Sequence, residues 1–336
     1  MKFSIEKNSF YKSISHVQNI VERKNTLPIL ANLLIEAKNN SLILSATDMD
    51  ISIKDSLDCN IIEEGSTTVS AHTLYEIVRK LPDNSEIEII SDDGKIMSLR
   101  AGKSKFSLGC LPKEDFPIIE IGDLENEITL NSKTLLKLIE KTRFAISNEE
   151  TRYFLNGIYF HNHQNQDLNT LSVVATDGHR LAKMDSDLKE KVKEFPGIII
   201  PKKTINEVYK LLSDLDEITK INLNSNKIVF FIRNTILISK LIDGNFPDYK
   251  KVIPIDNTNK LIVNRNDFSL AIDRVSTIVS EKSPVIKFKL MNNLMNLSSV
   301  NSESGTATED LAIDYNGDSI EIGFNSKYIL EMINNL

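Results

Sequence analysis

The chain opens with a pattern of apolar and polar positions that returns twice further along. Residues 4–10, SIEKNSF, alternate as a short strand does and lead through a polar turn into an amphipathic run. The same order of positions recurs in residues 129–135, TLNSKTL, and 262–268, IVNRNDF. Repeats at this spacing predict three domain-sized units along the chain.

A second copy of the pattern lies inside each unit. Residues 68–74, TVSAHTL, are echoed by 199–205, IIPKKTI, and by 323–329, GFNSKYI. Asn, Ser or Pro stands ahead of the apolar run in each copy, as is typical of the first residues of a helix. Each unit is therefore predicted to repeat within itself.

Short alternating segments follow the helices and have the pattern of hairpins. Residues 86–90 and 95–99 flank an Asp-Gly turn, which is a strong signal for a tight hairpin. Residues 228–232 and 235–238 flank Arg-Asn in the same way. The half-unit is predicted to consist of one strand, one helix and three antiparallel strands.

These repeats predict an α+β chain of three tandem domains, each made of two β-α-β-β-β half-repeats. We expect the domains at 1–120, 128–253 and 260–336, joined by polar linkers at 118–127 and 254–260. Two helices lie on one face of the sheets of each domain, so three domains in an arc place them along its concave side. The helices are expected in the windows 8–20, 72–81, 132–144, 202–212, 265–279 and 325–335.

The last half-unit is shorter than the others. The half-units that begin at Thr68 and Ile199 run on through three strands, whereas the one that begins at Gly323 has only a strand and a helix before Leu336. By the same spacing, about 35 further residues would complete it. We therefore expect an incomplete third domain, in which the apolar face of the last helix lacks its sheet. That face holds Tyr328, Ile329 and Met332.

Composition narrows the class of protein. The 336 residues are 41% hydrophobic and 26% charged, which is typical of a globular protein with ordinary cores. No apolar run approaches the roughly 18 residues of a membrane span, and the start, MKFSIEKNSF, lacks a signal peptide. Two cysteines, Cys59 and Cys110, are too few for a disulfide framework or a multi-cysteine zinc site. We expect reduced thiols buried in strands, a cytoplasmic protein, and no metal, cofactor or membrane partner.

Charge is distributed unevenly between the helices and the rest of the chain. The formal net charge is −7, which by itself argues against a conventional DNA-binding module. The six helix windows nevertheless hold 13 Lys and Arg against 6 Asp and Glu, and the remainder holds 27 against 41. Solvated helix faces usually mix the two signs. The segregation therefore favours a polyanion on the helical side, held through its phosphates without regard to sequence.

Three blocks of sequence resemble the bacterial replicative sliding clamps, the β subunits of DNA polymerase III. They are 26–30, TLPIL, with 46–48, ATD; 153–157, YFLNG, with 175–182, ATDGHRLA; and 241–249, LIDGNFPDY. The resemblance extends over the whole chain. It implies a non-catalytic processivity factor that forms a head-to-tail homodimeric ring around duplex DNA. The implied partners are the polymerase III catalytic subunit, clamp-loader subunits and other proteins that carry a clamp-binding motif.

The resemblance also implies a pocket for partner peptides on the second domain and near the third. Apolar residues of the pocket would receive Leu or Phe anchors, while Arg180, Lys251 and the backbone at Gly178 would fix polar groups. Lys251 stands where the family usually has Arg, which keeps the charge but loses the forked geometry. The implied pocket residues are Leu155, Thr176, Gly178, His179, Arg180, Leu181, Pro247, Lys251 and Val252.

DNA contacts and the subunit interface are carried over in the same way. Tyr153 and Phe154 are expected on an exposed loop, where their rings would brace a base or sugar. Glu149 stands where relatives can carry an amide, and a carboxylate there would repel phosphate. The DNA-binding residues are Lys24, Arg79, Lys80, Tyr153, Phe154, Lys202 and Lys203. The interface residues are Phe106 and Leu108 of the first domain and Ile278 and Val279 of the third.

Two other classes of protein remain as alternatives. An enzyme would use His161 and His163 as metal ligands, or His179 in acid–base chemistry. A metal site needs at least three ligands, and the segment HNHQNQD is interpreted as a solvated hairpin tip, with His179 as a pocket wall. The second alternative is a monomeric peptide-binding scaffold that does not encircle DNA. Native mass separates a ring from that scaffold.

Overall fold

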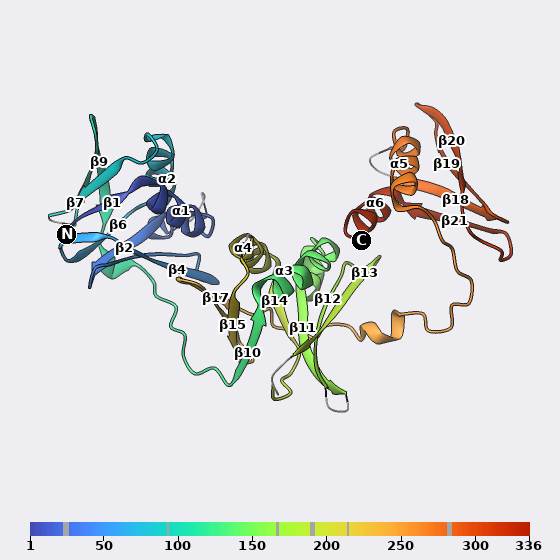
Figure 1. The fold of residues 1–336 in the computed structure, drawn as a ribbon, viewed down its shortest axis with the longest axis horizontal. Coiled ribbons are helices and arrows are strands. Elements are labelled where there is room, and N and C mark those ends of the chain that lie inside the picture. The colour runs from blue at the N-terminus through green and yellow to red at the C-terminus, as the bar shows by residue number, and fades with distance from the viewer. Residues whose placement is uncertain (23–26, 93, 166–167, 189–191, 214, 281–283) are drawn as a thin grey trace. The chain divides into compact units, whose positions relative to one another are not determined.

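A computed structural model describes the chain from residue 1 to 336, apart from residues 23–26, 93, 166–167, 189–191, 214 and 281–283. The chain divides into two compact units (Figure 1). The first comprises Met1–Asp177 and Leu181–Asn245, and the second comprises Gly178–Arg180 and Phe246–Leu336.

The first two half-units follow the predicted order of one strand, one helix and three antiparallel strands. The elements of the first are β1 (Lys2–Glu6), α1 (Lys7–Gln18), η1 (Pro28–Ala31), β2 (Asn32–Lys38), β3 (Ser41–Thr47), β4 (Ile51–Asp58) and the additional β5 (Asn60–Glu63). Those of the second are β6 (Gly65–Ser70), α2 (Ala71–Lys80), β7 (Glu86–Ile90), β8 (Ile96–Ala101), β9 (Ser104–Leu111) and η2 (Lys113–Asp115).

The third and fourth half-units repeat this order. The third has β10 (Asn126–Asn131), α3 (Ser132–Glu140), η3 (Arg143–Ala145), η4 (Glu150–Leu155), β11 (Gly157–Asn165), β12 (Leu168–Thr176) and β13 (Leu181–Leu188). The fourth has β14 (Ile198–Pro201), α4 (Lys202–Leu212), β15 (Ile218–Leu223), β16 (Lys227–Ile232) and β17 (Thr235–Lys240). Both hairpins predicted from sequence, β7–β8 and β16–β17, are antiparallel pairs.

Paired half-units exchange their opening strands. β1 pairs with β7 of the following half-unit, whereas β6 pairs with β2 of the preceding one. The same exchange joins β10 to β15 and β14 to β11. Each sheet therefore needs a strand from both halves, so a half-unit by itself would leave unpaired strand edges. This exchange explains why the repeat occurs in pairs.

Caps fix the helix starts that the polar turns predicted. Asn131 accepts a hydrogen bond from the backbone N–H of Lys133 at 2.9 Å and caps α3. Ser70 caps α2 through the N–H of Thr73. The cap of α1 is Glu6, whose carboxylate accepts from two backbone N–H groups. Those hydrogen bonds lower the pKa of Glu6, as an anion at a helix N-terminus should.

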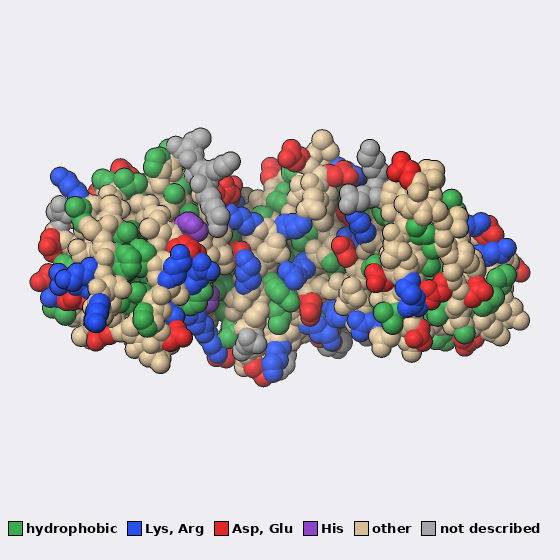
Figure 2. Space-filling model, turned by 90° about the horizontal axis from the view of Figure 1, so that it is seen from above, with side chains coloured by type: hydrophobic (Ala, Val, Ile, Leu, Met, Phe, Trp, Pro, Cys, Tyr) green, Lys and Arg blue, Asp and Glu red, His purple; other side chains and the backbone are tan. Residues whose placement is uncertain are grey.

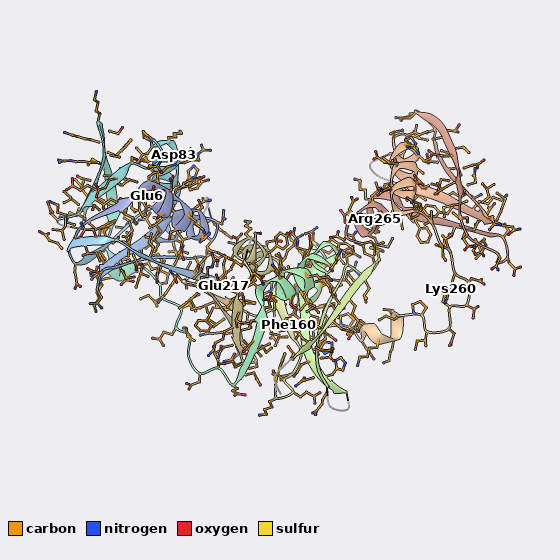
Figure 3. All side chains as sticks on the ribbon, in the orientation of Figure 1. Glu6, Asp83, Phe160, Glu217, Lys260 and Arg265 are labelled. Carbon is orange, nitrogen blue, oxygen red and sulfur yellow. The ribbon has the colours of Figure 1, made fainter. Side chains whose placement is uncertain are left out.

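The helices of the first unit lie along one side, and the sheets lie along the other (Figure 1). α1 packs on α2, and α3 packs on α4. Between helices and sheets runs one continuous core, which includes Phe10, Leu74, Phe160 and Phe230 (Phe160 is labelled in Figure 3). Strands that alternate, such as β7, bury the residues of one face in this core and leave those of the other face partly or fully exposed.

Phe230 supports a direct test of this core. Its side chain is 1% exposed, whereas Phe231, the next residue of β16, is only partly buried. Phe230→Ala should lower the free energy of unfolding by about 3–5 kcal/mol, because the truncation leaves a cavity in a packed interior. Phe231→Ala is the matched control and should cost much less. Urea unfolding measures both, and equal losses would contradict the assigned faces of the strand.

The second unit contains one half-unit and the start of another, but the opening strand that the sequence predicted at residues 262–263 is only an isolated bridge between Ile262 and Asp314. Its elements are η5 (Tyr249–Val252), α5 (Arg265–Ser276), β18 (Val285–Met291), β19 (Leu294–Asn301), β20 (Gly305–Ala312), β21 (Ile320–Asn325) and α6 (Ser326–Asn334). The sheet order is β20-β19-β18-β21, so β21 pairs with β18 as β6 pairs with β2. Arg265 of α5 donates to the carbonyl of Ile333 in α6 at 2.9 Å (Figure 3).

The last helix is better covered than the sequence predicted. Ile333 is 2% exposed, and Ile329 packs against the same core as Phe268 and Phe288. Only Met332 of the expected bare face is openly exposed, at 39%. The prediction was wrong for Ile329 because α6 packs on α5 and β21.

Both predicted linkers lack regular secondary structure over most of their length. Residues 117–125 and 254–261 contain no helix or strand, and β10 begins at Asn126, inside the first expected linker. Among the described helices, none combines the length and apolar character that a membrane crossing needs.

Candidate functional site

The first two domains meet in a continuous sheet. β17 pairs antiparallel with β4 from Thr235↔Asp55 to Ser239↔Ile51, which joins strands of the fourth half-unit to those of the first. Asp55, with 6% exposure, accepts a hydrogen bond from the Thr235 hydroxyl at 2.7 Å. Its other oxygen lies 3.2 Å from Nδ1 of His16 in α1. The sheet therefore joins the first two domains edge to edge along β4 and β17.

Lys203 of α4 reaches across this joint. Its ammonium donates to the Asp48 carboxylate at 2.5 Å, to the Glu22 carboxylate at 3.2 Å and to the Ile20 carbonyl at 3.0 Å. Burial by itself lowers the pKa of Lys203, but the hydrogen bonds and charges of Asp48 and Glu22 outweigh it and raise the pKa. In the sequence Asp48 is notable only as part of the ATD block. Its pairing with Lys203, 155 residues away, could not be predicted from neighbouring residues.

The other predicted DNA-binding lysines and arginines of the first unit differ in their partners. Lys202 donates to the Asn148 side-chain oxygen at 2.6 Å. Arg79 and Lys80 are exposed at the end of α2, where Glu76 pairs with both, at 2.7 Å and 3.5 Å. Exposed pairs of this kind are weak and leave a cation accessible. Lys24 lies outside the described residues.

The two predicted aromatic residues lie in η4, a short 3-10 helix. Tyr153 is 55% exposed, and its ring meets that of Phe154 edge to face at 5.9 Å. Gly244 lies behind them, and a Cβ there would be 3.2 Å from the Cβ of Phe154. Arg152 binds both oxygens of Glu149 at 2.7 Å. A carboxylate neutralised in this way repels a phosphate less than a free one.

Three predicted pocket residues belong to the first unit. Leu155 ends η4 and is 3% exposed, so it contributes to the interior of this unit. Thr176 and Leu181 are directly opposite each other in the β12–β13 pair, and both are half-buried. The apolar side chain that remains accessible in this group is Leu181.

The remaining six pocket residues belong to the second unit. Arg180 forms an ion pair with Glu331 at 2.5 Å, and its guanidinium lies 4.4 Å from the centre of the Tyr328 ring. His179 stacks on the same ring. Pro247, Lys251 and Val252 are exposed in and beside η5, and Gly178 turns with a φ of 86°. In this structure, therefore, the guanidinium of Arg180 is paired with a carboxylate of the same unit.

Phe106 and Leu108 lie on a strand with one open side. β9 pairs with β8 from Ser104 to Gly109, but it pairs with β6 only at Cys110 and Leu111. In the described part of the chain, residues 104–109 thus have a strand neighbour on one side only. Phe106 and Leu108 are partly buried against the core, while the neighbouring Lys105 is exposed.

The second unit has a matching open strand. β20 is the edge of its sheet and pairs with β19 alone among the described strands. Ile278 and Val279 follow α5 and are partly buried. Glu303 and Asp310 lie exposed near the two ends of β20. A strand edge with unpaired backbone groups is a ready surface for pairing with another chain.

His161 and His163 are not in a solvated hairpin tip, so that prediction was wrong. Both lie in β11, opposite Ser172 and Thr170 of β12, and His161 is 9% exposed. Asn162 between them accepts a hydrogen bond from the backbone N–H of Phe195. This amide anchors the segment to the following chain, which draws it out of solvent. No cluster of three His, Cys, Asp or Glu suited to a metal occurs among the described residues.

The cysteines are less buried than predicted. Both Cys59 and Cys110 are half-buried, and Cys59 lies between β4 and β5 rather than in a strand. Burial first, and then the charge of Asp58, raises the pKa of the Cys59 thiol. Cys110 lies in β9, as predicted.

Family models match the chain in three consecutive segments. They are the N-terminal domain of the DNA polymerase III beta subunit over residues 1–120, the central domain over 129–248, and the C-terminal domain over 250–336. The fold is thus α+β with three tandem clamp domains, as the repeats predicted.

Named relatives and solved structures agree with these models. The beta sliding clamp of Caulobacter vibrioides NA1000 is 43% identical over 333 residues, which are 99% of this chain and 90% of that protein. That of Rickettsia felis is 35% identical over 346 residues, with the same coverage. The DnaN sliding clamp of Bartonella birtlesii, solved with griselimycin bound, has a TM-score of 0.96 and 45% identity over 100% of this chain and 90% of that one.

The class is therefore that of DNA clamps. The chain belongs to the DNA polymerase III beta subunit family. As a member of this family it is a sliding clamp, a processivity factor in DNA replication that is accessory rather than catalytic.

Proposed function

We propose that the chain forms a head-to-tail homodimeric ring that encircles duplex DNA and slides on it without sequence specificity. The observation that carries this proposal is the placement of α1, α2, α3 and α4 along one side of the first unit. We take the domains as 1–120, 128–253 and 260–336, with their helices lining the hole. The cytoplasm is the proposed place of action.

The charge of the helices supports a phosphate partner. The described α-helices hold 12 Lys and Arg against 6 Asp and Glu, although the whole chain has a net charge of −7. Figure 2 looks onto the helical side, where Lys and Arg side chains lie at several places across the first unit with Asp and Glu between them. A field of this kind attracts the DNA backbone without reading bases.

The two open strand edges support closure of the ring. Pairing of β9 in one copy with β20 of another would satisfy both edges, and it would repeat head to tail. Exposed Lys103 and Lys105 at β9 have the opposite charge to Glu303 and Asp310 at β20. The interface would also enclose the four predicted residues, Phe106, Leu108, Ile278 and Val279.

Partner peptides are proposed to bind the nine pocket residues. Leu155, Leu181, Pro247 and Val252 supply apolar surface, while His179, Arg180 and Lys251 supply polar contacts with Thr176 and Gly178. The proposed partners are the polymerase III catalytic subunit, clamp-loader subunits and other proteins with a clamp-binding motif.

Native mass tests the ring against a monomeric peptide-binding scaffold. A closed homodimer should have twice the 38.0 kDa mass of one chain at micromolar concentration. A mass of 38.0 kDa at every concentration would support the monomeric scaffold and contradict the proposed ring.

Lys202 is the proposed phosphate contact with the clearest prediction. It begins α4, and its described partner is a neutral amide rather than a carboxylate. Lys202→Ala should weaken DNA binding equally for all sequences and reduce the slope of log affinity against log salt by about 1. Asn148→Ala is the matched control and should leave that slope unchanged. An unchanged slope in Lys202→Ala would contradict the assignment.

A further inference from the structure

Two adjacent lysines at the start of α4 have different surroundings. Lys202 has an amide partner on its own domain, whereas Lys203 has three acceptors, all from the first domain. A lysine ammonium has three N–H donors and no acceptor. Asp48, Glu22 and the Ile20 carbonyl therefore take every donor of Lys203, and none is left for a phosphate.

The Asp48 carboxylate is nearly buried and fixed by hydrogen bonds. The side chain of Asp48 is 9% exposed, compared with 56% for Glu22. One of its oxygens accepts from the backbone N–H groups of Asp50 and Ile51, at 2.9 Å and 2.8 Å, which fixes the turn between β3 and β4. The other oxygen takes Lys203. A nearly buried carboxylate is costly without a cation, so the pair is mutually dependent.

The turn that presents Asp48 is itself constrained. Met49 has a φ of +80°. Residues other than glycine rarely adopt this backbone conformation, which persists only where the surroundings impose it. The Thr47 hydroxyl also accepts from the Met49 N–H and donates to the Ile51 carbonyl. Asp48 is thus held in one position by contacts that do not involve Lys203, which makes the contact directional rather than a loose surface pair.

Further contacts run along the same joint. The backbone N–H of Lys240 in β17 donates to the Asp50 carbonyl at 2.8 Å, and its ammonium lies 3.0 Å from the Asp50 carboxylate. At the far end Asp55 holds Thr235. The strand pairing aligns the two domains along β4 and β17, while Lys203 is attached to the helix layer above the sheet. A contact in that second layer lies away from the strand axis and opposes rotation of one domain about it.

We infer that Lys203 is a positioning residue that fixes the angle between the first two clamp domains through Asp48 and Glu22. It therefore acts on the placement of the DNA-facing helices, and Lys202 beside it makes the phosphate contact. This role concerns the joint and holds whether or not the chain forms a ring on DNA.

Distance measurement across the joint tests the inference on the full chain. Spin labels are placed at exposed Lys38 and Ser225, each replaced by Cys, with Cys59→Ser and Cys110→Ser to remove the native thiols. Lys203→Met and Asp48→Asn should each broaden the distance distribution and shift its mean, because Asn keeps the oxygen that holds the turn but loses the charge. Combining the two should add nothing further. Lys202→Met removes the same charge from the same helix and should leave the distribution unchanged.

Two results would overturn the inference. An unchanged distribution in Lys203→Met, together with a salt slope reduced as in Lys202→Met, would make Lys203 a phosphate contact. A lower melting temperature with an unchanged distribution would show a contribution to stability without control of the angle. Loss of DNA binding in every variant concerns the proposed function and leaves the distance result intact.

Discussion

Phe106→Asp combined with Leu108→Asp should convert the protein from a dimer into single 38.0 kDa subunits. Both side chains lie on the part of β9 that has one open side, so two carboxylates there would face an apolar partner surface without compensation. Central interface residues can each contribute about 2 kcal/mol or more, and that corresponds to roughly a 30-fold weaker dissociation constant for each. Sedimentation at several concentrations measures the effect.

A second pair of variants separates loss of the interface from loss of the fold. Phe106 and Leu108 are partly buried, so their replacement also disturbs the core. Lys103→Glu with Lys105→Glu changes only exposed side chains at the same edge and should weaken the dimer as well. Ile118→Asp adds a charge at a 63% exposed apolar residue in the linker and serves as the control. Full dimers in the Lys103→Glu, Lys105→Glu variant would contradict pairing through β9.

Leu181→Asp should reduce the binding of a polymerase-derived peptide by roughly 30-fold or more. An apolar anchor in a small pocket accounts for about 2 kcal/mol or more, and an aspartate there would have to be desolvated. Leu181 is a better probe than Leu155, because Leu155 is 3% exposed and its replacement would damage the domain. Fluorescence anisotropy with a labelled peptide provides the affinity.

Ile218→Asp is the matched control for this pocket variant. Ile218 begins β15 of the same domain, is 64% exposed and lies outside the nine pocket residues. It should bind the peptide as the parent does. Equal affinity in Leu181→Asp and Ile218→Asp would place the peptide elsewhere on the chain.

Local patterns predicted the secondary structure well, because they depend on residues close in sequence. The Asp-Gly turn and the alternation around it gave β7 and β8, and Asn131 ahead of its apolar run gave the start of α3. The repeat order then gave the tandem domains, since each half-unit restates the same local signals. The exchange of β1 and β6 between halves was not predictable in this way, because strand pairing depends on the whole domain.

Sequence patterns did not predict the surroundings of side chains that contact residues far away in the chain. The local sequence around Lys203 is that of a helix start, and the contact of Lys203 with Asp48 is visible only in the fold. His161 lies in a polar run that is typical of a loop, yet pairing with β12 and the amide of Asn162 bring it inside. Glu6 caps α1 with its carboxylate, which accepts from two backbone N–H groups, and the sequence pattern did not mark it as a cap.

Retention on circular and linear DNA tests the central claim most directly. The protein is loaded onto a nicked circular plasmid and washed at about 0.5 M salt, where contacts with phosphates are largely lost. A closed ring should stay on the circle because it is linked to it, and it should leave once the plasmid is cut at one site. Equal retention on the circular and the linear plasmid would contradict encirclement of DNA by this chain.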